Sequence, residues 1–373
     1  MDTFCLESAM TASENSPVLQ FFENLQLSFL DEFDKGVAQL SVTLKKRPSH
    51  FQIATPHESS EDRILAMEPG VPERKMTYSW PGKTPQEAWK FSCILRILSL
   101  IFEAVQNNML ITKRCRTLQG AVQLFGTQSV VNTIVDDIAY TVGVDRAALH
   151  VISVGKGLAA GAFRIMTKAK NCLDMSVEAV FRRLVHNKYH LNSAAGKGIL
   201  ITGKGYPDIC TREFVHLISD IATKNSSSIL RGLKITPPTA TPRFLALVDG
   251  DCDGVAIMST YKYGSMAHAH ASAHLNAPRL EWLGTRIKDV VIEQNRNGND
   301  GEDWAMISLS HRDVKKVRSM LAKNPVFSED GPELEWRAEL QTMMMLNMKA
   351  ETEVLYGTGG GLEGWIDRKM KDL

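Results

Sequence analysis

An apolar run that stops at a cluster of acids is the feature that most constrains this chain. Residues 244–248 read Phe-Leu-Ala-Leu-Val, and Asp249, Asp251 and Asp253 follow at alternate positions. A strand that is apolar at every position needs cover on both faces, which is typical of parallel sheets flanked by helices. Ligands of such sheets bind beyond the carboxyl ends of the strands. The run therefore predicts an α/β domain with a site at Asp249.

The spacing of these carboxylates favours a metal site. Two carboxylates at alternate positions just past a strand can share one hard cation, and oxygen ligands suit Mg²⁺. An ordinary acidic turn is the alternative, because Asp and Gly are common turn residues. The pattern does not fit a calcium loop, which needs a preceding helix and a Glu at its twelfth position, where this chain has Thr260.

A second buried strand is predicted at residues 198–205, which read Gly-Ile-Leu-Ile-Thr-Gly-Lys-Gly. The segment is a near miss to the ATP-binding phosphate loop, since its strand lies between the glycines and Gly205 replaces the expected Ser or Thr. A tight turn that presents Lys204 to a phosphate is the remaining interpretation. A helix over 212–223 lies between the two strands, so the chain alternates strand and helix from about residue 151.

The region before residue 155 has a different pattern. Helices are predicted over 84–107, starting at Thr84-Pro85, and from Thr127 to a stop at Gly143, and a strand over 149–152. Helices that close on a short β element, with basic residues between them, suggest a winged-helix-like DNA-binding module. These basic residues are Lys113, Arg114 and Arg116.

The rest of the chain completes the predicted organisation. Residues 1–16 are expected to be disordered, 17–41 to contain an amphipathic helix, 42–85 to be a loose linker and 311–356 to be helical. We therefore expect three parts: an N-terminal extension (1–83), a winged-helix-like domain (84–155) and an α/β domain with a central, mostly parallel sheet and C-terminal helices (156–373).

Charge and cysteine usage narrow the functional class. The formal net charge is only +1, so any basic face must be local. Residues 155–205 contain nine Lys or Arg against two acids, which favours a groove for a nucleic-acid backbone, with a solvated face as the alternative. Six scattered cysteines without a CxxC pair indicate reduced thiols in the cytosol or nucleus. We expect no membrane partner, because Arg96 and Glu103 interrupt the most apolar stretch.

Several motifs, in order along residues 84–366, resemble those of the topoisomerase VI A-subunit family of type IIB topoisomerases, and most of all its eukaryotic meiotic branch. The acidic run with Tyr261–Ser265 is similar to the Toprim signature of that family. The other matching motifs are Ile201–Asp208 with Thr211-Arg212, Gln123–Gly126, Asp137-Ile138, Leu149-His150 through Lys156–Leu158, Trp282–Gly284 and Gly361–Ile366.

The resemblance implies an α+β protein in which a winged-helix tyrosine attacks a DNA phosphate and a Toprim domain holds Mg²⁺. It implies a topoisomerase-like isomerase that makes the double-strand breaks of meiotic recombination, in the nucleus and on chromosomes. Each subunit would cut one strand, so a homodimer is expected. ATP would enter only through a separate B-type subunit, and other break-machinery proteins would be partners.

Site residues carry over from this family position by position. Asp249 and Asp251 match its metal-binding aspartates, and Asp253 is an extra acid. The metal-binding glutamate falls on Glu178 if a short deletion is allowed, and on Ser176 by strict counting. Arg114 matches an arginine four positions before the nucleophile. The expected DNA contacts are Lys113, Arg116, Lys156, Lys204 and Arg212.

One departure bears directly on activity. The nucleophilic tyrosine is replaced by Leu118 or Gln119, depending on the direction of counting, and no tyrosine lies between residues 79 and 139. The alternative to a cleaving enzyme is therefore a catalytically inactive DNA-binding relative, or a gene model with a splicing error. A metal-dependent primase or phosphatase on the same Toprim fold is disfavoured by the winged-helix-like module.

Overall fold

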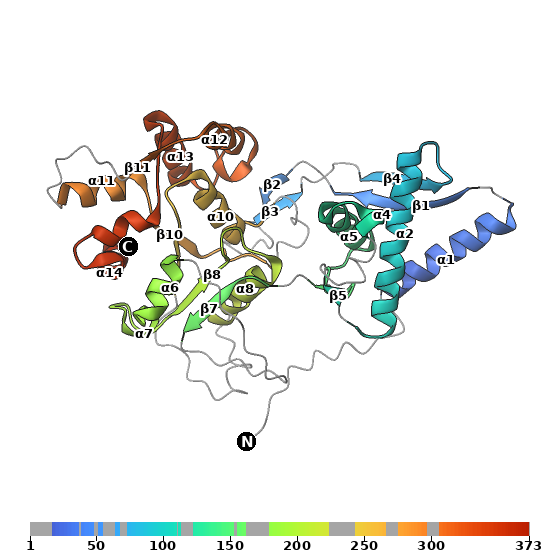
Figure 1. The fold of residues 1–373 in the computed structure, drawn as a ribbon, viewed down its shortest axis with the longest axis horizontal. Helices are drawn as coiled ribbons and strands as arrows, with labels where there is room; N and C mark the ends of the chain where they lie inside the picture. Colours follow the sequence, from blue (N-terminus) through green and yellow to red (C-terminus); the bar gives the residue numbers. More distant parts are fainter. Residues whose placement is uncertain are drawn as a thin grey trace, which may run out of the picture. The chain divides into compact units, whose positions relative to one another are not determined.

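The structure is a computed structural model, and its described residues form two compact units (Figure 1). The first unit lies within residues 1–49 and 69–154, and the second within 50–68 and 155–373. None of the described helices is long and apolar enough to cross a membrane. The described residues are 17–36, 39–47, 51–54, 64–67, 73–109, 111–112, 122–152, 155–161, 179–223, 243–265, 275–296 and 306–372.

The first unit packs helices against a two-stranded antiparallel sheet. Helices α2 (Pro85–Gln106) and α5 (Gln128–Val142) contact strands β4 (Arg74–Trp80) and β1 (Leu40–Lys46), and α1 (Pro17–Asp34) covers part of the same core. The smaller elements are β5 (Ile111–Thr112), α4 (Val122–Phe125) and β6 (Val151–Ile152), with β5 and β6 paired in parallel.

The predicted helices of this unit are confirmed close to their predicted ends. Thr84 caps α2, since its hydroxyl accepts a hydrogen bond from the Glu87 amide at 3.2 Å, and Pro85 occupies the first turn. Gly143 ends α5 in the left-handed conformation with φ of 80°, which favours glycine. Thr127 is the N-cap of α5 but forms no side-chain capping bond.

The prediction of a loose linker over residues 42–85 was wrong. Strands β1 and β4 pair along seven residues within this stretch and its margins. Val42 and Leu44 are each 1% exposed, whereas Thr43 faces outward and its hydroxyl lies 2.8 Å from that of Thr77. The alternation of apolar and polar residues makes this a half-buried strand, although it ends in Lys45 and Lys46.

The second unit contains most of the remaining elements around two apolar clusters. Its first half comprises β2 (Phe51–Ala54), β3 (Ile64–Met67), β7 (Leu158–Gly161), α6 (Ala179–His186), α7 (Tyr189–Asn192), β8 (Ile199–Thr202), α8 (Ile209–Thr223) and β9 (Phe244–Leu247). Its second half comprises α10 (Cys252–Lys262), β10 (Leu280–Gly284), α11 (Ile287–Arg296), β11 (Met306–Ser308), α12 (His311–Lys323), the 3-10 helix η2 (Pro325–Phe327), α13 (Leu334–Leu346), β12 (Met348–Ala350), the 3-10 helix η3 (Thr352–Gly357) and α14 (Gly361–Asp372).

The unit mixes helices and strands, as an α/β domain does, but its strands pair differently from the prediction. Strands β9 and β10 are parallel, whereas β8 pairs with β7 in the antiparallel direction. Within the described ranges every sheet has two strands, so a central, mostly parallel sheet is not confirmed. The four residues of β9 are half-buried rather than fully enclosed, in keeping with so small a sheet.

The expectation of continuous helix over residues 311–356 was only partly correct. Helices α12 and α13 lie there, but β12 and η3 follow α13. Asn347 ends α13 in the left-handed conformation with φ of 52°, and β12 then pairs with β11. This change of direction brings the chain back to the turn that follows β9.

Candidate metal centre

The acidic turn joins the parallel pair β9–β10 to helix α10. Backbone bonds continue the pairing beyond β9, since the Val248 amide donates to the Gly284 carbonyl at 2.8 Å. The turn needs glycine at position 254, because a Cβ there would lie 2.2 Å from the Asp249 carbonyl oxygen. The carboxylates are thus presented by a tightly built turn at the carboxyl end of a parallel strand, where α/β proteins bind ligands.

Asp251 is the N-cap of α10. One of its oxygens, Oδ1, accepts a hydrogen bond from the Gly254 amide at 2.7 Å. Burial raises the pKa of Asp251 above its ordinary value, and the neighbouring carboxylates of Asp249 and Asp253 raise it further. These like charges indicate a place where a cation would be stabilised.

Asp249 is exposed, and only one of its oxygens has a partner among the described residues. Its Oδ1 accepts from the Thr352 amide at 2.9 Å and from the Thr352 hydroxyl at 2.8 Å. Across the described ranges neither Asp249 nor Asp251 forms an ion pair with a Lys, Arg or His. Both aspartates therefore keep a negative charge that the described protein does not neutralise by direct pairing.

Asp253 differs from the other two acids of the turn. It forms an ion pair with Lys316 of α12 and accepts a hydrogen bond from the Tyr206 hydroxyl at 3.0 Å. Burial alone would raise the pKa of Asp253, but the Lys316 ammonium outweighs that effect and lowers it. Asp253 thus already has a cationic partner.

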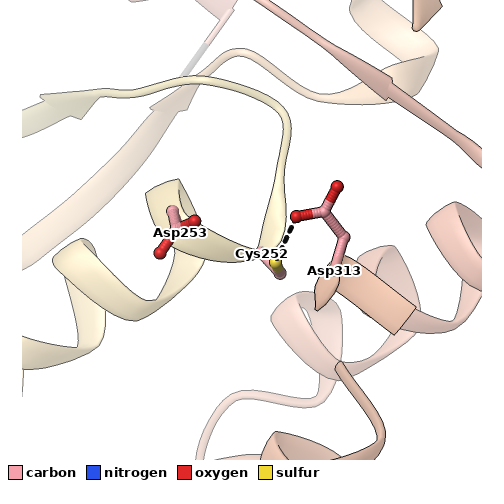
Figure 2. A group of neighbouring side chains, drawn as sticks. All are labelled: Cys252, Asp253 and Asp313. Carbon is pink, nitrogen blue, oxygen red and sulfur yellow. Dashed lines mark hydrogen bonds between the residues drawn. The ribbon is translucent and has the colours of Figure 1, made fainter. Parts of the chain in front are cut away.

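A second group of possible ligands lies at the first residues of helices α10 and α12 (Figure 2). Ligand atoms of Cys252, Asp253 and Asp313 lie within 4.8 Å of one another, and the Asp313 carboxylate points at the Cys252 sulfur, 3.9 Å away. Asp313 is paired with Lys349 at 3.0 Å, and burial raises the pKa of the Cys252 thiol to about 11. A protonated thiol beside two carboxylates that already have partners is a poor metal site.

The donor set of the turn fits a hard cation. Asp249 and Asp251 each commit one oxygen to the protein, and the other oxygen accepts no hydrogen bond from the described part of the chain. Two unneutralised carboxylates at a solvent-facing turn match the oxygen ligands and partial hydration that Mg²⁺ prefers. The third candidate ligand, Glu178, lies outside the described residues, as does Ser176.

The predicted basic residues of the second unit separate into two groups. Lys156 and Lys204 lie together, since the Lys156 ammonium donates to the Lys204 carbonyl at 3.0 Å and the Lys156 amide donates to Asp208 at 2.7 Å. Lys156 is exposed, and Lys204 sits in the turn after β8 with φ of 51°. The Lys156 side chain therefore lies against the backbone of the turn that contains Lys204.

Arg212 is placed differently from the DNA contact expected of it. It is 2% exposed, and its guanidinium donates to the Leu275 carbonyl at 3.3 Å and to Asn276 at 3.1 Å. Burial lowers its pKa to about 10. Because the guanidinium is enclosed by its own unit, Arg212 stabilises the 275–276 segment and is not available to a DNA phosphate.

The remaining predicted site residues fall outside the described ranges. They are Lys113, Arg114 and Arg116, together with the two nucleophile positions, Leu118 and Gln119.

Sequence reasoning missed three side chains that shape the centre. Thr352 holds Asp249, Lys316 neutralises Asp253, and Lys349 pairs with Asp313. Nothing marks them locally, since Thr352 is 103 residues from Asp249 in sequence. Only the acidic turn itself could be found from the sequence pattern.

Comparison with known proteins agrees with these observations. The family described as type IIB DNA topoisomerase matches residues 89–151, and the Toprim domain of the topoisomerase 6 A-subunit/Spo11 proteins matches residues 172–224 and 235–361. The chain is 28% identical to the A3 subunit of DNA topoisomerase 6 from Oryza sativa subsp. indica, over 73% of this chain and 61% of that protein.

Two meiotic proteins are similar over more of their length. Meiotic recombination protein rec12 of Schizosaccharomyces pombe is 27% identical over 97% of both chains. Meiotic recombination protein SPO11 of Homo sapiens is 33% identical, over 92% of this chain and 84% of that protein. The resemblance seen in the motifs is thus confirmed along most of the chain. The chain belongs to the topoisomerase 6 A-subunit/Spo11 family.

Proposed function

We propose that this chain binds duplex DNA together with Mg²⁺ and acts in the DNA double-strand cleavage that initiates meiotic recombination. The observation that carries the proposal is the Asp249–Asp251 pair, two carboxylates that no cation of the described residues pairs with, at a strand end open to solvent. The names of the relatives, meiotic recombination proteins and topoisomerase subunits, support the same substrate.

In this proposal Asp249 and Asp251 hold the metal ion, with Glu178 as the third ligand. When bound, Mg²⁺ would supply positive charge that offsets the charge of a DNA phosphate. The protein's part is to fix the two aspartates: Gly254 holds Asp251 through a capping bond, and Thr352 holds Asp249.

The DNA backbone is bound by basic side chains in both units. In the second unit, Lys156 and Lys204 would contact DNA phosphates. In the first unit, the phosphate contacts would come from Lys113, Arg114 and Arg116. Lysines directed at phosphates carry no base information, so we expect binding that is tolerant of sequence and sensitive to salt.

Several finer features of the proposal come from the family. We propose a winged-helix-like domain over 84–155 and a Toprim domain over 156–373, preceded by an extension over 1–83. A homodimer would place one active centre on each DNA strand. A B-type subunit would supply any ATP dependence, other break-machinery proteins would assist, and the complex would work on chromosomes in the nucleus.

A second candidate function is a DNA-binding relative that does not cleave. Transesterification needs a positioned oxygen nucleophile, and neither Leu118 nor Gln119 carries a hydroxyl. The same observation would follow from a splicing error in the gene model. Sequencing the transcript across residues 110–180 separates these cases, and trapping a covalent DNA adduct with detergent in the presence of a B-type subunit tests cleavage directly.

The metal-dependent binding is tested by measuring duplex affinity during a Mg²⁺ titration. We expect affinity to rise with Mg²⁺ for the unmodified chain, and no such rise for Asp249→Ala or Asp251→Ala. Arg243→Ala is a matched surface control at the far end of β9, where the side chain pairs with Glu281. Identical titration curves for the unmodified chain and both aspartate variants would exclude this site.

A further inference from the structure

Residues near the C-terminus of the second unit, from β12 to the start of η3, hold the acidic turn through hydrogen bonds. Strand β12 ends at Ala350, whose amide and carbonyl form two backbone hydrogen bonds with Gly250, at 3.1 and 2.8 Å. A Cβ at position 250 would lie 3.1 Å from the Thr285 carbonyl oxygen, so the turn is also closely packed on its other side. The backbone between Asp249 and Asp251 is therefore clamped by two segments distant in sequence.

The chain that follows this clamp reaches the Asp249 side chain. Thr352, the first residue of η3, donates both its amide and its hydroxyl to the same oxygen of Asp249. Thr352 is 3% exposed, and its hydroxyl in turn accepts a hydrogen bond from the buried Thr285 hydroxyl at 3.4 Å. A buried, doubly anchored donor thus holds an exposed carboxylate in one orientation.

This arrangement has a direct consequence for the second oxygen of Asp249. An exposed aspartate ordinarily samples several side-chain rotamers, and binding a metal ion would have to order it. Oδ1 is held by two donors from Thr352, whereas Oδ2 accepts no hydrogen bond from the described residues. The carboxylate is then oriented before any ion arrives, which is the usual effect of outer-shell groups on metal ligands.

We propose that Thr352 is a positioning residue of the metal centre, which orients Asp249 and thereby sets the affinity for the divalent cation. The inference rests on the proposed function, since it presumes that Asp249 binds the ion. It assigns a role to a segment in which none of the family-like motifs lies.

A buried threonine can also stabilise a fold without serving a site, and this chain offers such a residue nearby. Thr358 is 6% exposed, and its hydroxyl donates to the Leu355 carbonyl at 2.8 Å and lies 3.1 Å from the Gly361 carbonyl. Within the described residues its hydroxyl contacts backbone atoms and does not reach Asp249. Thr358→Val is therefore the control for simple loss of a buried hydroxyl.

The experiment measures Mn²⁺ binding to the full chain without DNA, from the EPR signal of the free ion, with Mg²⁺ as competitor. Thr352→Val should weaken ion binding by about tenfold, the lower end of the usual effect of outer-shell substitutions. Thr352→Ser keeps the hydroxyl and should restore affinity to near that of the unmodified chain. Thr358→Val should lower the unfolding temperature and leave ion affinity unchanged.

Two further variants distinguish failure of this inference from failure of the proposed metal site. If Thr352→Val does not fold, Thr352→Ala takes its place, since it also keeps the backbone donor and removes the hydroxyl. Unchanged ion affinity in Thr352→Val or Thr352→Ala, with affinity lost in Asp249→Ala, would overturn this inference and leave the proposed function standing. Unchanged affinity in Asp249→Ala as well would overturn the proposed metal site itself.

Discussion

Each unit of the molecule contains a pair of neighbouring acids, and the two pairs are handled in opposite ways. In the first unit Asp136 and Asp137 are 5% and 4% exposed, and each is paired with two cations. In the second unit Asp249 is exposed and Asp251 is half-buried, and the described residues supply no ion pair to either. Asp136 pairs with Arg47 and Arg146, and Asp137 pairs with Lys46 and Arg47.

The difference separates an acid pair whose charge the protein neutralises from one that it leaves without an ion pair among the described residues. Buried carboxylates are tolerated when the protein provides their counter-charges, and those of α5 join that helix to the end of β1. Burial raises the pKa of Asp251, and the like charges of Asp249 and Asp253 raise it further. A cation bound between these carboxylates would relieve their mutual repulsion.

The largest expected effect is on folding and concerns the neutralised pair. Asp136→Ala leaves the buried Arg146 guanidinium without its carboxylate, and we expect the first unit to lose about 3–5 kcal/mol of unfolding free energy. This loss of free energy is measured by monitoring hydrogen exchange of the α5 amides at increasing denaturant concentrations. Asp251→Asn, which keeps a capping side chain, should cost far less in the second unit. Equal losses in both units would remove the distinction between the pairs.

The next effect concerns the stabilisation that an external ion provides. Mg²⁺ at one hundred times its dissociation constant should stabilise the second unit by about 2.7 kcal/mol, because it binds the folded state alone. The effect should disappear in Asp251→Asn, as measured by thermal unfolding with and without Mg²⁺. Asp137→Asn should unfold at a lower temperature yet keep the Mg²⁺ effect. A Mg²⁺ effect that vanished in Asp137→Asn instead would reverse the roles of the two pairs.

The sequence predicted local features of the fold better than distant ones. The start of α2 at Thr84-Pro85 and the end of α5 at Gly143 follow from side-chain and backbone preferences within one helical turn. Strand β1 was missed because its charges and threonines obscured the alternation at Val42 and Leu44. Strand β12 was missed because its partners, β11 and Gly250, are distant in the chain.

The same distinction between local and distant features applies to the candidate site. Asp249 and Asp251 were found because they directly follow an apolar strand, so their spacing alone indicates a shared ligand. Thr352 and Lys316 were not found, since each acts on the turn through tertiary contacts and neither belongs to a local pattern. Arg212 lies inside a family motif and yet is buried, which its sequence position alone does not reveal.

A smaller effect is expected on the salt dependence of DNA binding. Removing one phosphate contact with Lys156→Ala should reduce the slope of log affinity against log salt concentration by about 1. Lys156 is a good test because its exposed side chain lies beside Lys204, away from any described ion pair of its own. Arg243→Ala should leave the slope unchanged. A slope near zero for the unmodified chain would exclude a basic DNA-binding face.

The smallest effect is expected at the third acid of the turn, which combines features of both pairs. Asp253 belongs to the acidic turn by sequence, yet Lys316 neutralises it as Arg47 and Arg146 neutralise Asp136. The Lys316–Asp253 ion pair is partly exposed, and such a pair contributes about 0.5 kcal/mol to the free energy of unfolding. We therefore expect Asp253→Asn to change Mg²⁺ affinity by less than about threefold. Calorimetric titration of Asp253→Asn beside Asp251→Asn measures the difference. If both variants lost affinity equally, the centre would be a three-acid site, and pairing with a lysine would no longer distinguish structural acids from metal ligands in this protein.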